Sequence, residues 1–586
     1  MKQLLWTFVL DHHYLTLDNK SITRKLKLII QLMELHEENP FKIRSYQSAI
    51  YTIDQGAISL EGLDKEALQE IKGIGKSMAE VISSLKETQT SPILDELLAK
   101  TPEGLLEVLQ IKGLGPKKIK ILWKDLNVTS THELMEACQS GQVAKLKGFG
   151  ERTQQGIIQA MEYTAANTGK WLYADIEEVV GALRQDLEQK FGMGKVAITG
   201  DYARYLEILD NIELVIETAD GKAVFDPINS IPSLVQDLKT SSPYNWRGEI
   251  KGLDIKVMIH FTSPTFFVRE NLLRTGSRAH LLSPVLEYPS LAGFFRSKPF
   301  ESELQAYEEA GLSFIPAELR EGQFEMQLAK EGKIPELLEL DDLKGSLHNH
   351  STYSDGKHSL RDMASYCKGL GYEYLGIADH SKSAFYAGGL DIETVIAQQQ
   401  EIKILNQELA PFRIFSGIES DILIDGSLDY PEDVLSSFDF IVASIHSSLG
   451  MNRQKATARL LTAIGNPYTT ILGHPTGRLL LRREGYPIDH KIIIDACAAN
   501  NVVIEINANP WRLDLDWRWV NYAMEQGVKL SINPDAHEKE AFSHMKYGVL
   551  IGRKGGLTPE MTLNALSADD LAAYFDNRKA RIGSGV

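Results

Sequence analysis

Between residues 345 and 537, short apolar runs of strand length alternate with longer amphipathic stretches of helical length. The amphipathic stretches span 359–370, 392–408, 453–464 and 489–500. This alternation predicts a parallel sheet whose strands are connected by helices, and seven such units suggest a closed barrel. The seven apolar runs are "GSLHNH", "YLGIADH", "RIFSGIES", "FDFIVASIH", "TTILGHP", "VVIEINAN" and "VKLSINPDAH".

Histidines and carboxylates stand at the ends of these runs. Because the carboxyl ends of barrel strands meet at one mouth, we expect these side chains to converge there. Imidazole and carboxylate ligands without a thiolate suit Zn²⁺, Mn²⁺ or Fe²⁺, and nine ligands exceed the needs of one ion. The sequence therefore predicts a site for two or three divalent ions. Its ligands are His348, His350, Asp355, His380, Glu419, His446, His474, Asp535 and His537.

A structural histidine held by hydrogen bonds is the alternative at any single position. That alternative explains poorly why six histidines occupy the same place in successive units. We interpret His358, His490 and His544 as structural histidines, because they do not follow the strand-end pattern.

The first 165 residues contain one pattern three times: "LQEIKGIGKSMAEVI" (68–82), "VLQIKGLGPKKIKIL" (108–122) and "VAKLKGFGERTQQGI" (143–157). Two glycines permit a tight turn between two helices, and the second helix then presents free backbone N–H groups to a phosphate. One copy is also explained by a glycine that ends a helix, but three copies indicate backbone-directed DNA binding without sequence specificity. The pattern resembles the helix-hairpin-helix motif of DNA repair proteins. The DNA-binding residues that we expect are Lys72, Gly73, Gly75, Lys76, Lys112, Gly113, Gly115, Lys117, Lys147, Gly148 and Gly150.

Charge and cysteine content change this picture little. The formal net charge is −17, and residues 1–150 carry 19 basic and 19 acidic side chains, so the whole excess (43 against 60) lies in residues 151–586. An acidic body fits a protein that holds cations, although a solvated acidic surface explains it equally well. Three widely spaced cysteines and an apolar N-terminal stretch too short for a membrane span favour a cytoplasmic protein with no membrane partner.

Residues 341–577 resemble the PHP (polymerase and histidinol phosphatase) phosphoesterase domain, through the motifs H-x-H, S-D-G, D-H, G-I-E, S-I-H, G-H-P and D-A-H. The resemblance implies a distorted (β/α)7 barrel and a trinuclear site that hydrolyses phosphate esters, with Mn²⁺ as the activating ion. Clustered cations activate a water and neutralise charge on the phosphate. Arg478 and Arg512 follow the fifth and sixth runs and are candidates to grip a phosphate or the DNA backbone, with a surface salt bridge as the alternative. The catalytic residues that we assign are Asp355, His380, His446, Arg478 and Arg512.

The order of hairpins followed by a PHP domain resembles bacterial family-X DNA polymerases, and "ENPFKIRSYQSAI" (38–50) fits the start of their N-terminal domain. The resemblance implies a nucleotidyltransferase palm between the two parts, with a Gly-Ser turn, a D-x-D strand and a third aspartate. This chain has Gly200 and Asp201 at the turn, Asn211 and Glu213 at the D-x-D positions, and Asp254 as the third carboxylate. Asparagine carries no charge, glutamate moves its carboxylate outward by one methylene, and Asp201 repels a triphosphate. We therefore expect an inactive polymerase site that is poorly suited to Mg²⁺.

The predicted chain is multidomain, α+β and α/β: a helical helix-hairpin-helix head, a nucleotidyltransferase-like palm and thumb, and the PHP barrel. We predict a DNA-repair metallophosphoesterase, a metal-dependent 3′→5′ exonuclease that also removes 3′-phosphates or cuts at abasic sites, acting on DNA with a gap or a 3′ end. An active template-directed polymerase with a PHP exonuclease, and a small-molecule phosphatase of the histidinol phosphatase type, are the alternatives. The segments that we expect are 1–16 (N-terminal extension), 17–95 (first hairpin), 96–165 (two further hairpins), 166–325 (palm and thumb), 326–340 (linker), 341–577 (PHP domain) and 578–586 (tail).

Overall fold

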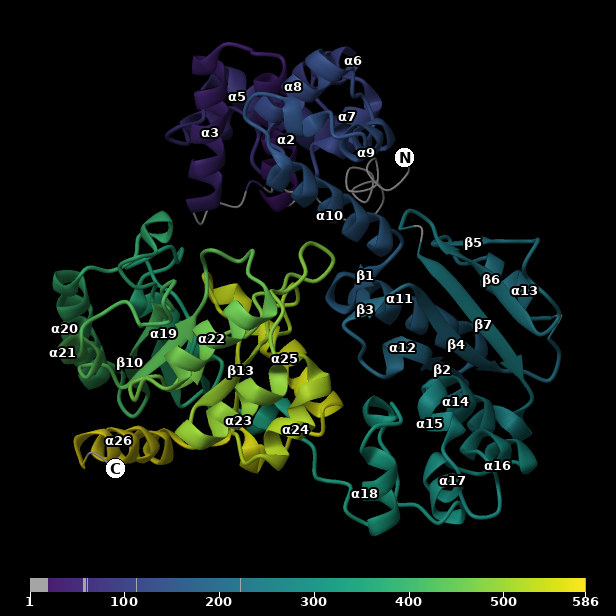
Figure 1. The fold of residues 1–586 in the computed structure, drawn as a ribbon. Helices are drawn as coiled ribbons and strands as arrows, with labels where there is room; N and C mark the ends of the chain where they lie inside the picture. Colours follow the sequence, from purple (N-terminus) through teal and green to yellow (C-terminus); the bar gives the residue numbers. More distant parts are fainter. Residues whose placement is uncertain are drawn as a thin grey trace. The chain divides into compact units, whose positions relative to one another are not determined.

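The computed structural model describes residues 19–55, 60, 62–111, 113–221, 223–253 and 255–584. The predicted N-terminal extension, Lys112 and Asp254 lie outside the described residues. The described residues form two compact units, one of residues 19–168 with 250–253 and the other of residues 169–249 with 255–584 (Figure 1). The helical head is therefore one unit, and the palm, thumb and barrel share the second.

The head is entirely helical, and its core is formed by the apolar faces of short amphipathic helices. Ile22, Leu26 and Ile29 on its first long helix are fully buried, with Ile82 and Leu122 from two of the hairpin helices. Serine or aspartate caps several of these helices, as at Ser91 and Ser130, which accept hydrogen bonds from backbone N–H groups. Its helices are α2 (Asn19–Leu35), α3 (Pro40–Gln55), α4 (Lys65–Glu70), α5 (Lys76–Thr88), α6 (Pro92–Lys100), α7 (Glu103–Val108), α8 (Pro116–Leu126), α9 (Thr131–Gln139), the 3₁₀ turn η2 (Val143–Lys145) and α10 (Glu151–Asn167).

The palm is a five-stranded mixed sheet in the order β2-β4-β7-β6-β5, in which β4 runs parallel to β7. Alternating apolar residues of β4 and β7 face the core, and Trp246 on β6 is fully buried. Helices α11, α12 and α14 pack against β2 and β4 (Figure 1). The palm elements are β1 (Trp171–Leu172), α11 (Tyr173–Phe191), β2 (Val196–Thr199), α12 (Gly200–Ala203), β3 (Ile208–Leu209), β4 (Asn211–Glu217), α13 (Phe225–Asn229), β5 (Leu234–Gln236), β6 (Asn245–Ile250) and β7 (Lys256–Thr262).

The thumb is a small helical subdomain whose core is rich in aromatic residues, including Phe294, Phe295, Phe300 and Tyr307. Met326 and Ala329 of helix α18 belong to this core, so the start of the segment suggested as a linker is ordered and packed. The helices are α14 (Phe267–Thr275), α15 (Arg278–Leu282), α16 (Leu291–Ser297), α17 (Glu303–Glu309) and α18 (Glu325–Glu331).

Seven parallel strands form the barrel, in chain order from β8 to β14. Their apolar residues are buried on both faces: Phe440 and Val442 of β11 point into one core cluster, and Ile441 and Ala443 into another. The predicted (β/α)7 barrel is thus confirmed. The strands are β8 (Gly345–Ser346), β9 (Tyr374–Ile377), β10 (Arg413–Asp421), β11 (Phe440–Ser444), β12 (Ile471–Leu472), β13 (Val503–Asn507) and β14 (Leu530–Asn533).

The helices around the barrel coincide closely with the amphipathic stretches read from the sequence, because Ser359, Asp391, Asn452 and Asp489 cap four of them. The last helix continues to residue 584, through most of the suggested tail, and its Phe575 packs on Phe440 inside the barrel. The helices are α19 (Leu360–Gly369), α20 (Ile392–Leu409), α21 (Glu432–Leu435), α22 (Arg453–Ile464), α23 (His490–Asn500), α24 (Val520–Glu525), α25 (Met545–Lys554) and α26 (Ala568–Ser584).

A side chain closes the barrel where its first and last strands meet. Asn564 is fully buried; its amide donates to the carbonyls of Gly345 on β8 (3.1 Å) and Ile532 on β14 (2.9 Å). Its side-chain oxygen accepts from the Ile532 N–H at 2.7 Å. Beyond the strands, the His350 N–H donates to the Ala536 carbonyl at 2.8 Å. Asparagine can satisfy both strands because its side chain both donates and accepts.

Helix α25 connects the barrel to the palm and thumb. Lys546 and Tyr547 both bond Glu177 of α11, at 2.6 and 2.9 Å, and Arg553 bonds Glu318 of the thumb at 2.6 Å. Lys554 is 1% exposed and donates to the Arg204 carbonyl at 2.9 Å and to the Glu321 carboxylate. Burial lowers the pKa of Lys554 to about 8, although Glu321 opposes the shift.

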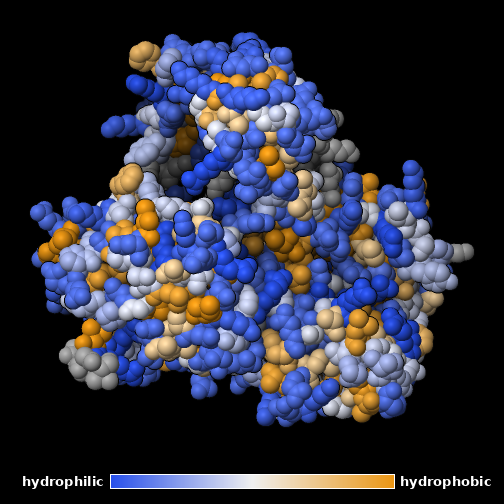
Figure 2. Space-filling model, viewed as in Figure 1, coloured by the Kyte–Doolittle hydropathy of each residue, from blue (hydrophilic) through white to orange (hydrophobic). Residues whose placement is uncertain are grey.

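The face shown in Figure 2 is mostly hydrophilic, with apolar side chains scattered among the polar ones. Among the helices that the structure describes, none is long and apolar enough to cross a membrane. Cys138, Cys367 and Cys497 are all buried and unpaired.

Candidate functional site

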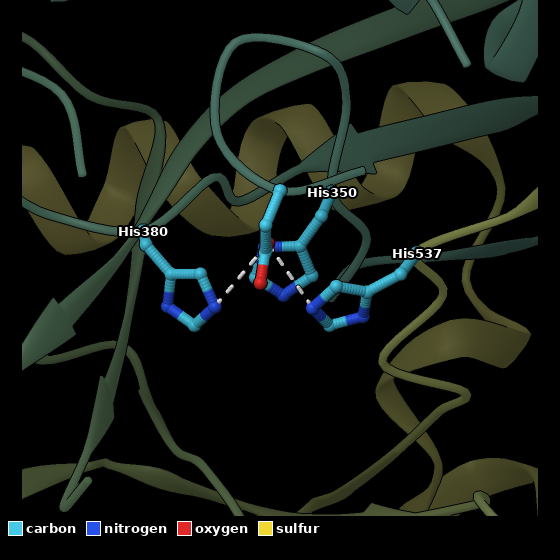
Figure 3. A group of neighbouring side chains, drawn as sticks. His350, His380 and His537 are labelled. Atoms are coloured by element: carbon cyan, nitrogen blue, oxygen red, sulfur yellow. Dashed lines mark ion pairs between the residues drawn. The ribbon is translucent and has the colours of Figure 1, made fainter. Parts of the chain in front are cut away.

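All nine predicted ligand residues lie together at the mouth of the barrel, where the loops after the strands meet. His350, His380 and His537 face a common point (Figure 3). The ligand atoms within each of three overlapping groups lie within 4.8 Å of one another. We call the nine residues the nine-ligand cluster. The three groups are His350, Asp355, His380 and His537; His348, His350 and Asp535; and His380, Glu419 and His446.

Glu419, on β10, is the centre of this cluster. One carboxylate oxygen lies 3.1 Å from Nε2 of both His446 and His474 and 3.2 Å from Nε2 of His348. The other oxygen lies 2.9 Å from Nδ1 of His380 and 3.7 Å from Nε2 of His350. With 1% of its side chain exposed, this carboxylate reaches histidines from four different strand ends.

Several buried atoms of the cluster have no hydrogen-bond partner among the described residues: Nε2 of His348, Nδ1 of His350, His380 and His474, and one oxygen of Glu419. Buried polar atoms are nearly always satisfied, and leaving several unsatisfied in one place is costly. Bound cations would satisfy them, and this nitrogen and oxygen donor set fits divalent metals. The residues present therefore fit a multinuclear metal site.

Three buried carboxylates behind the cluster orient its histidines and loops. Glu505 lies 2.8 Å from Nδ1 of His348, and Asp421 lies 2.5 Å from Nδ1 of His446. Asp379 accepts from Ser351 and Ser354, which fixes the loop that carries Asp355. Such partners set the tautomer and the direction of a ligating imidazole.

The sequence analysis missed these three carboxylates, although two of them carry a signal. Asp421 is two residues after Glu419 on the same strand, so both side chains point to one face. Glu505 is a lone acid within the apolar run "VVIEIN".

The cluster divides its histidines into charged and neutral ones. Burial alone would lower the pKa of His446, but Glu419 and Asp421 raise it to about 10. Burial alone would lower the pKa of His537, but Asp355 and Asp535 raise it to about 9. Burial and the neighbouring His537 and His380 lower the pKa of His350 to about 3.

The two predicted arginines differ in position. Arg512 reaches the cluster, with Nε 3.7 Å from Asp535. Arg478 points away from it and donates to Asp516 at 2.5 Å and to the carbonyls of Arg512 (2.8 Å) and Leu513. Arg478 therefore holds the backbone of the loop from which Arg512 extends.

That loop is also attached to the palm. Arg518 bonds Asp516 at 2.9 Å and Glu207, beside β3, at 3.2 Å. The indole N–H of Trp517 donates to the same Glu207 at 3.2 Å. A line of contacts thus runs from the palm through Asp516 and Arg478 to Arg512 at the barrel mouth.

The three repeats of the head form three turns whose first glycines share one conformation, although the second glycine of the third turn, Gly150, has a φ of 169° where Gly75 and Gly115 have −77° and −82°. The first glycine of each, Gly73, Gly113 and Gly148, has a positive φ of 100°, 90° and 85°. This left-handed conformation is costly for residues with a Cβ. The second glycine of each, Gly75, Gly115 and Gly150, is the N-cap of the next helix without a side-chain cap. The helix N–H groups are therefore left open to an outside acceptor.

Basic side chains around the turns are unevenly distributed. Lys72, Lys76, Lys117 and Lys147 are exposed. In the third turn the first helix is reduced to the 3₁₀ turn η2, and Glu151 opens the second helix where the first two turns have Lys76 and Pro116. Electrostatically, the third turn is thus less suited to phosphate than the first two.

In the palm, the carboxylates at the positions expected for the polymerase site are paired with basic neighbours. Asn211 and Glu213 share one face of β4, and Gly200 packs against Glu213. The Glu213 carboxylate lies 2.8 Å from Nε2 of His260 and 3.6 Å from Arg274. Asp201 is paired with Arg204.

The seven-stranded barrel with this cluster is a PHP domain: the family model described as "PHP domain" matches residues 346–509. In the head, "Helix-hairpin-helix domain" matches residues 17–91 and "SAM-like Helix-hairpin-helix tandem" matches residues 105–162. A DNA polymerase/3′-5′ exonuclease PolX of Bacillus subtilis (strain 168) is 35% identical over 572 residues, which cover 95% of this chain and 99% of the relative. The chain therefore belongs to the bacterial family-X DNA polymerases that carry a PHP domain.

Shorter relatives match the barrel region. A probable phosphatase of Thermoanaerobacter sp. (strain X514) is 27% identical over 192 residues, 31% of this chain and 76% of the relative. A probable phosphatase of Acetivibrio thermocellus is 24% identical over 247 residues, 40% of this chain and 96% of the relative. The chain is thus an enzyme whose barrel is shared with phosphatases and whose head binds DNA.

Metal binding should release protons. Against burial, Glu505 and Glu419 also raise the pKa of His348 well above its ordinary value. His348, His446 and His537 are therefore protonated near neutral pH without metal, and a ligating imidazole must be neutral, so each gives up its proton on coordination. Mn²⁺ affinity should fall as the pH is lowered from 9 to 6, with about three protons released per protein. Titration calorimetry in buffers of different ionisation enthalpy measures this number.

His537→Gln removes one of the three protonated histidines and should lower the number of released protons by about one. A proton count near zero in the unchanged protein would contradict the charge distribution described for the cluster.

Proposed function

We propose that this protein is a DNA-repair metallophosphoesterase, a metal-dependent 3′→5′ exonuclease whose polymerase palm is inactive. The observation that carries the proposal is the contrast between two carboxylate sites in one chain. In the barrel, all nine predicted ligand residues lie close together, and several of their buried atoms have no hydrogen-bond partner among the described residues. In the palm, Glu213 is already in contact with His260 and Arg274, and Asn211 supplies no charge.

The palm geometry removes what template-directed synthesis needs. Two Mg²⁺ ions require bridging carboxylates, but a glutamate held by two basic side chains would have to leave both of them first. Asp201 adds negative charge where a triphosphate would enter, although Arg204 offsets part of it. The Bacillus subtilis relative is named for both activities, and we propose that this chain shares the exonuclease and has lost the polymerase.

In the barrel, divalent ions bound by the nine-ligand cluster would activate a water and neutralise charge on the scissile phosphate. We propose two or three Mn²⁺ ions, with Zn²⁺ or Fe²⁺ accepted by the same donors. Asp355 and His537 are 37% and 36% exposed, so the phosphate enters on their side. Asp421 and Glu505 hold His446 and His348 in position, and Arg512 contacts a phosphate oxygen of the DNA.

The substrate that we propose is DNA with a gap or a recessed 3′ end, held through its backbone by the hairpins. Removal of 3′-phosphates and cleavage at abasic sites belong to the same proposal, because the PHP relatives of the barrel are probable phosphatases. A phosphatase acting only on small molecules would have no use for three phosphate-binding turns. A DNA substrate and three buried, unpaired cysteines favour a cytoplasmic location for the protein.

A 5′-labelled duplex with a recessed 3′ end, incubated with Mn²⁺ with and without deoxynucleotides, tests the proposal. We expect stepwise shortening that deoxynucleotides do not reverse. His348→Ala removes a ligand that contacts both Glu419 and Glu505 and should reduce the rate at least a hundredfold, as is typical when an electrostatic catalytic group is removed. His490→Ala, which removes a histidine outside the cluster that stacks on Trp519, is the histidine control.

Extension of the labelled strand, abolished by Glu213→Ala, would establish an active palm instead. Shortening that persists in His348→Ala would remove the barrel from the reaction.

Arg478→Ala should slow hydrolysis although Arg478 does not reach the cluster. Without it, the carbonyls of Arg512 and Leu513 lose their donor and Arg512 loses its fixed direction, and misplacement by about 1 Å typically costs about a hundredfold. We expect kcat to fall about tenfold to a hundredfold with unchanged metal content by elemental analysis. Arg361→Ala, which removes an exposed pair with Glu408, is the control, and a loss of metal in Arg478→Ala would assign it a different role.

DNA binding should depend on the exposed lysines of the hairpins. The triple variant Lys76→Ala, Lys117→Ala and Lys147→Ala removes about three phosphate contacts, so the slope of log affinity against log salt should fall by about three. Fluorescence anisotropy on two unrelated DNA sequences measures it. Both should weaken equally, whereas Lys100→Ala, in an exposed pair on α6, should leave them unchanged. Unequal loss would indicate base-specific contacts.

A further inference from the structure

Two aromatic side chains stand exposed beside the nine-ligand cluster. Phe385 is 86% exposed and Tyr386 is 61% exposed, on the 3₁₀ turn η6 (Phe385–Ala387) that follows β9. The ring of Tyr386 lies 6.5 Å from the ring of His380, a member of the cluster.

The turn that carries them is held firmly by the segments that carry the ligands. The Ser381 N–H donates to the Glu419 carbonyl at 3.0 Å, and the Leu390 N–H donates to the His380 carbonyl at 2.9 Å. The Ser383 hydroxyl donates at 2.8 Å to Asp421, the carboxylate that orients His446. The two aromatic rings are thus fixed relative to the metal ligands.

Tight packing on the inner side of the turn forces the rings outward. Ala384 and Ala387, on either side of them, are 0% and 4% exposed, and a Cβ on Gly389 would lie only 1.9 Å from the Ser381 carbonyl oxygen. Single exposed apolar residues are common and need no explanation. Two adjacent aromatic rings on an anchored turn at the edge of a hydrolytic site are a different case, since their burial would have stabilised the fold.

We propose that Phe385 and Tyr386 form a stacking platform for the base of the 3′-terminal nucleotide, which selects unpaired 3′ ends. The inference rests on the proposed exonuclease function and names the part of the substrate that this side of the site receives. The two rings are 6.1 Å apart and inclined by 78°, so one ring stacks on the base and the other borders its edge. Every base has a flat π face, so stacking accepts any sequence, as the hairpins of the head do.

The platform also determines which ends are cut fastest. A base can lie on the rings only after it has left its partner and its neighbour, and this costs least at a mismatched or frayed end. Arg512, on the loop after β13, contacts the phosphate of the same nucleotide. The terminal nucleotide is thereby held at its base and at its phosphate.

Substrates with and without the terminal base separate stacking from chemistry. We compare kcat/KM for duplexes that end in a mismatched 3′ thymidine, a paired 3′ thymidine or an abasic 3′ residue. The unchanged enzyme should prefer the mismatched base to the abasic end by about fivefold to a hundredfold, the usual range for stacking of one base. Phe385→Ala with Tyr386→Ala should abolish this preference, mainly through KM, and reduce the preference for mismatched over paired ends.

Two variants serve as controls. Tyr386→Phe keeps the ring and should keep the preference. Leu370→Ala removes a half-exposed apolar side chain at the end of α19, just before β9 and at the other end of the barrel, and should change nothing.

A binding measurement distinguishes failure of the platform from failure of the exonuclease. DNA with a 3′-terminal 2-aminopurine, and with a CH₂ group in place of the bridging 3′ oxygen of its last linkage, cannot be hydrolysed at that linkage, and stacking on the platform should quench its fluorescence at saturation. The double alanine variant should bind without quenching. Equal quenching in both proteins, or an unchanged preference for the base in the double variant, would overturn the platform. Quenching without hydrolysis of any end would overturn the exonuclease alone.

Discussion

The barrel mouth depends on one buried carboxylate. Glu419 lies within 3.7 Å of histidines from four strand ends, and a charged group at 1% exposure is tolerable only because so many partners surround it. A parallel barrel makes this possible, since every strand delivers its last side chains to the same end. The outer carboxylates Asp421 and Glu505 then fix the histidines that Glu419 brings together. Charge balance, rather than apolar packing, therefore shapes this end of the domain.

Much of the barrel could be predicted from the sequence because its signals are local. The seven apolar runs became seven strands, and four amphipathic stretches became helices α19, α20, α22 and α23 within one residue at most ends. The first and last strands were less accessible: β8 has two residues, and its link to β14 passes through Asn564, a side chain 219 residues away along the chain. No periodic pattern in the sequence predicts this contact, because it depends on closure of the whole barrel.

The candidate site, like the barrel, could be predicted only in part from the sequence. Strand-end position was sufficient to find nine side chains that lie together at the barrel mouth, but not to tell Arg512 from Arg478, which occupy similar places after neighbouring strands. The difference is geometric: one side chain extends to Asp535 and the other turns back to Asp516 and two carbonyls. Nor could the sequence show that Glu213 would be met by His260, since that contact requires β4 and β7 to lie side by side.

Helix α25 has a consequence for how such a chain can change over evolution. Four of its side chains are committed to acids and a carbonyl of the palm and thumb, and Lys554 carries its ammonium group into a buried interface. If the palm and thumb were deleted, the barrel would expose Trp517 and leave Lys554 without its acceptors, so the deletion would cause misfolding and not only the loss of an activity. Substitutions that abolish catalysis in the palm leave its contacts with the barrel intact. Substitutions that unfold the palm remove the contacts that stabilise helix α25. A lineage that no longer needs the polymerase can thus lose its chemistry residue by residue, and it must still inherit the domain.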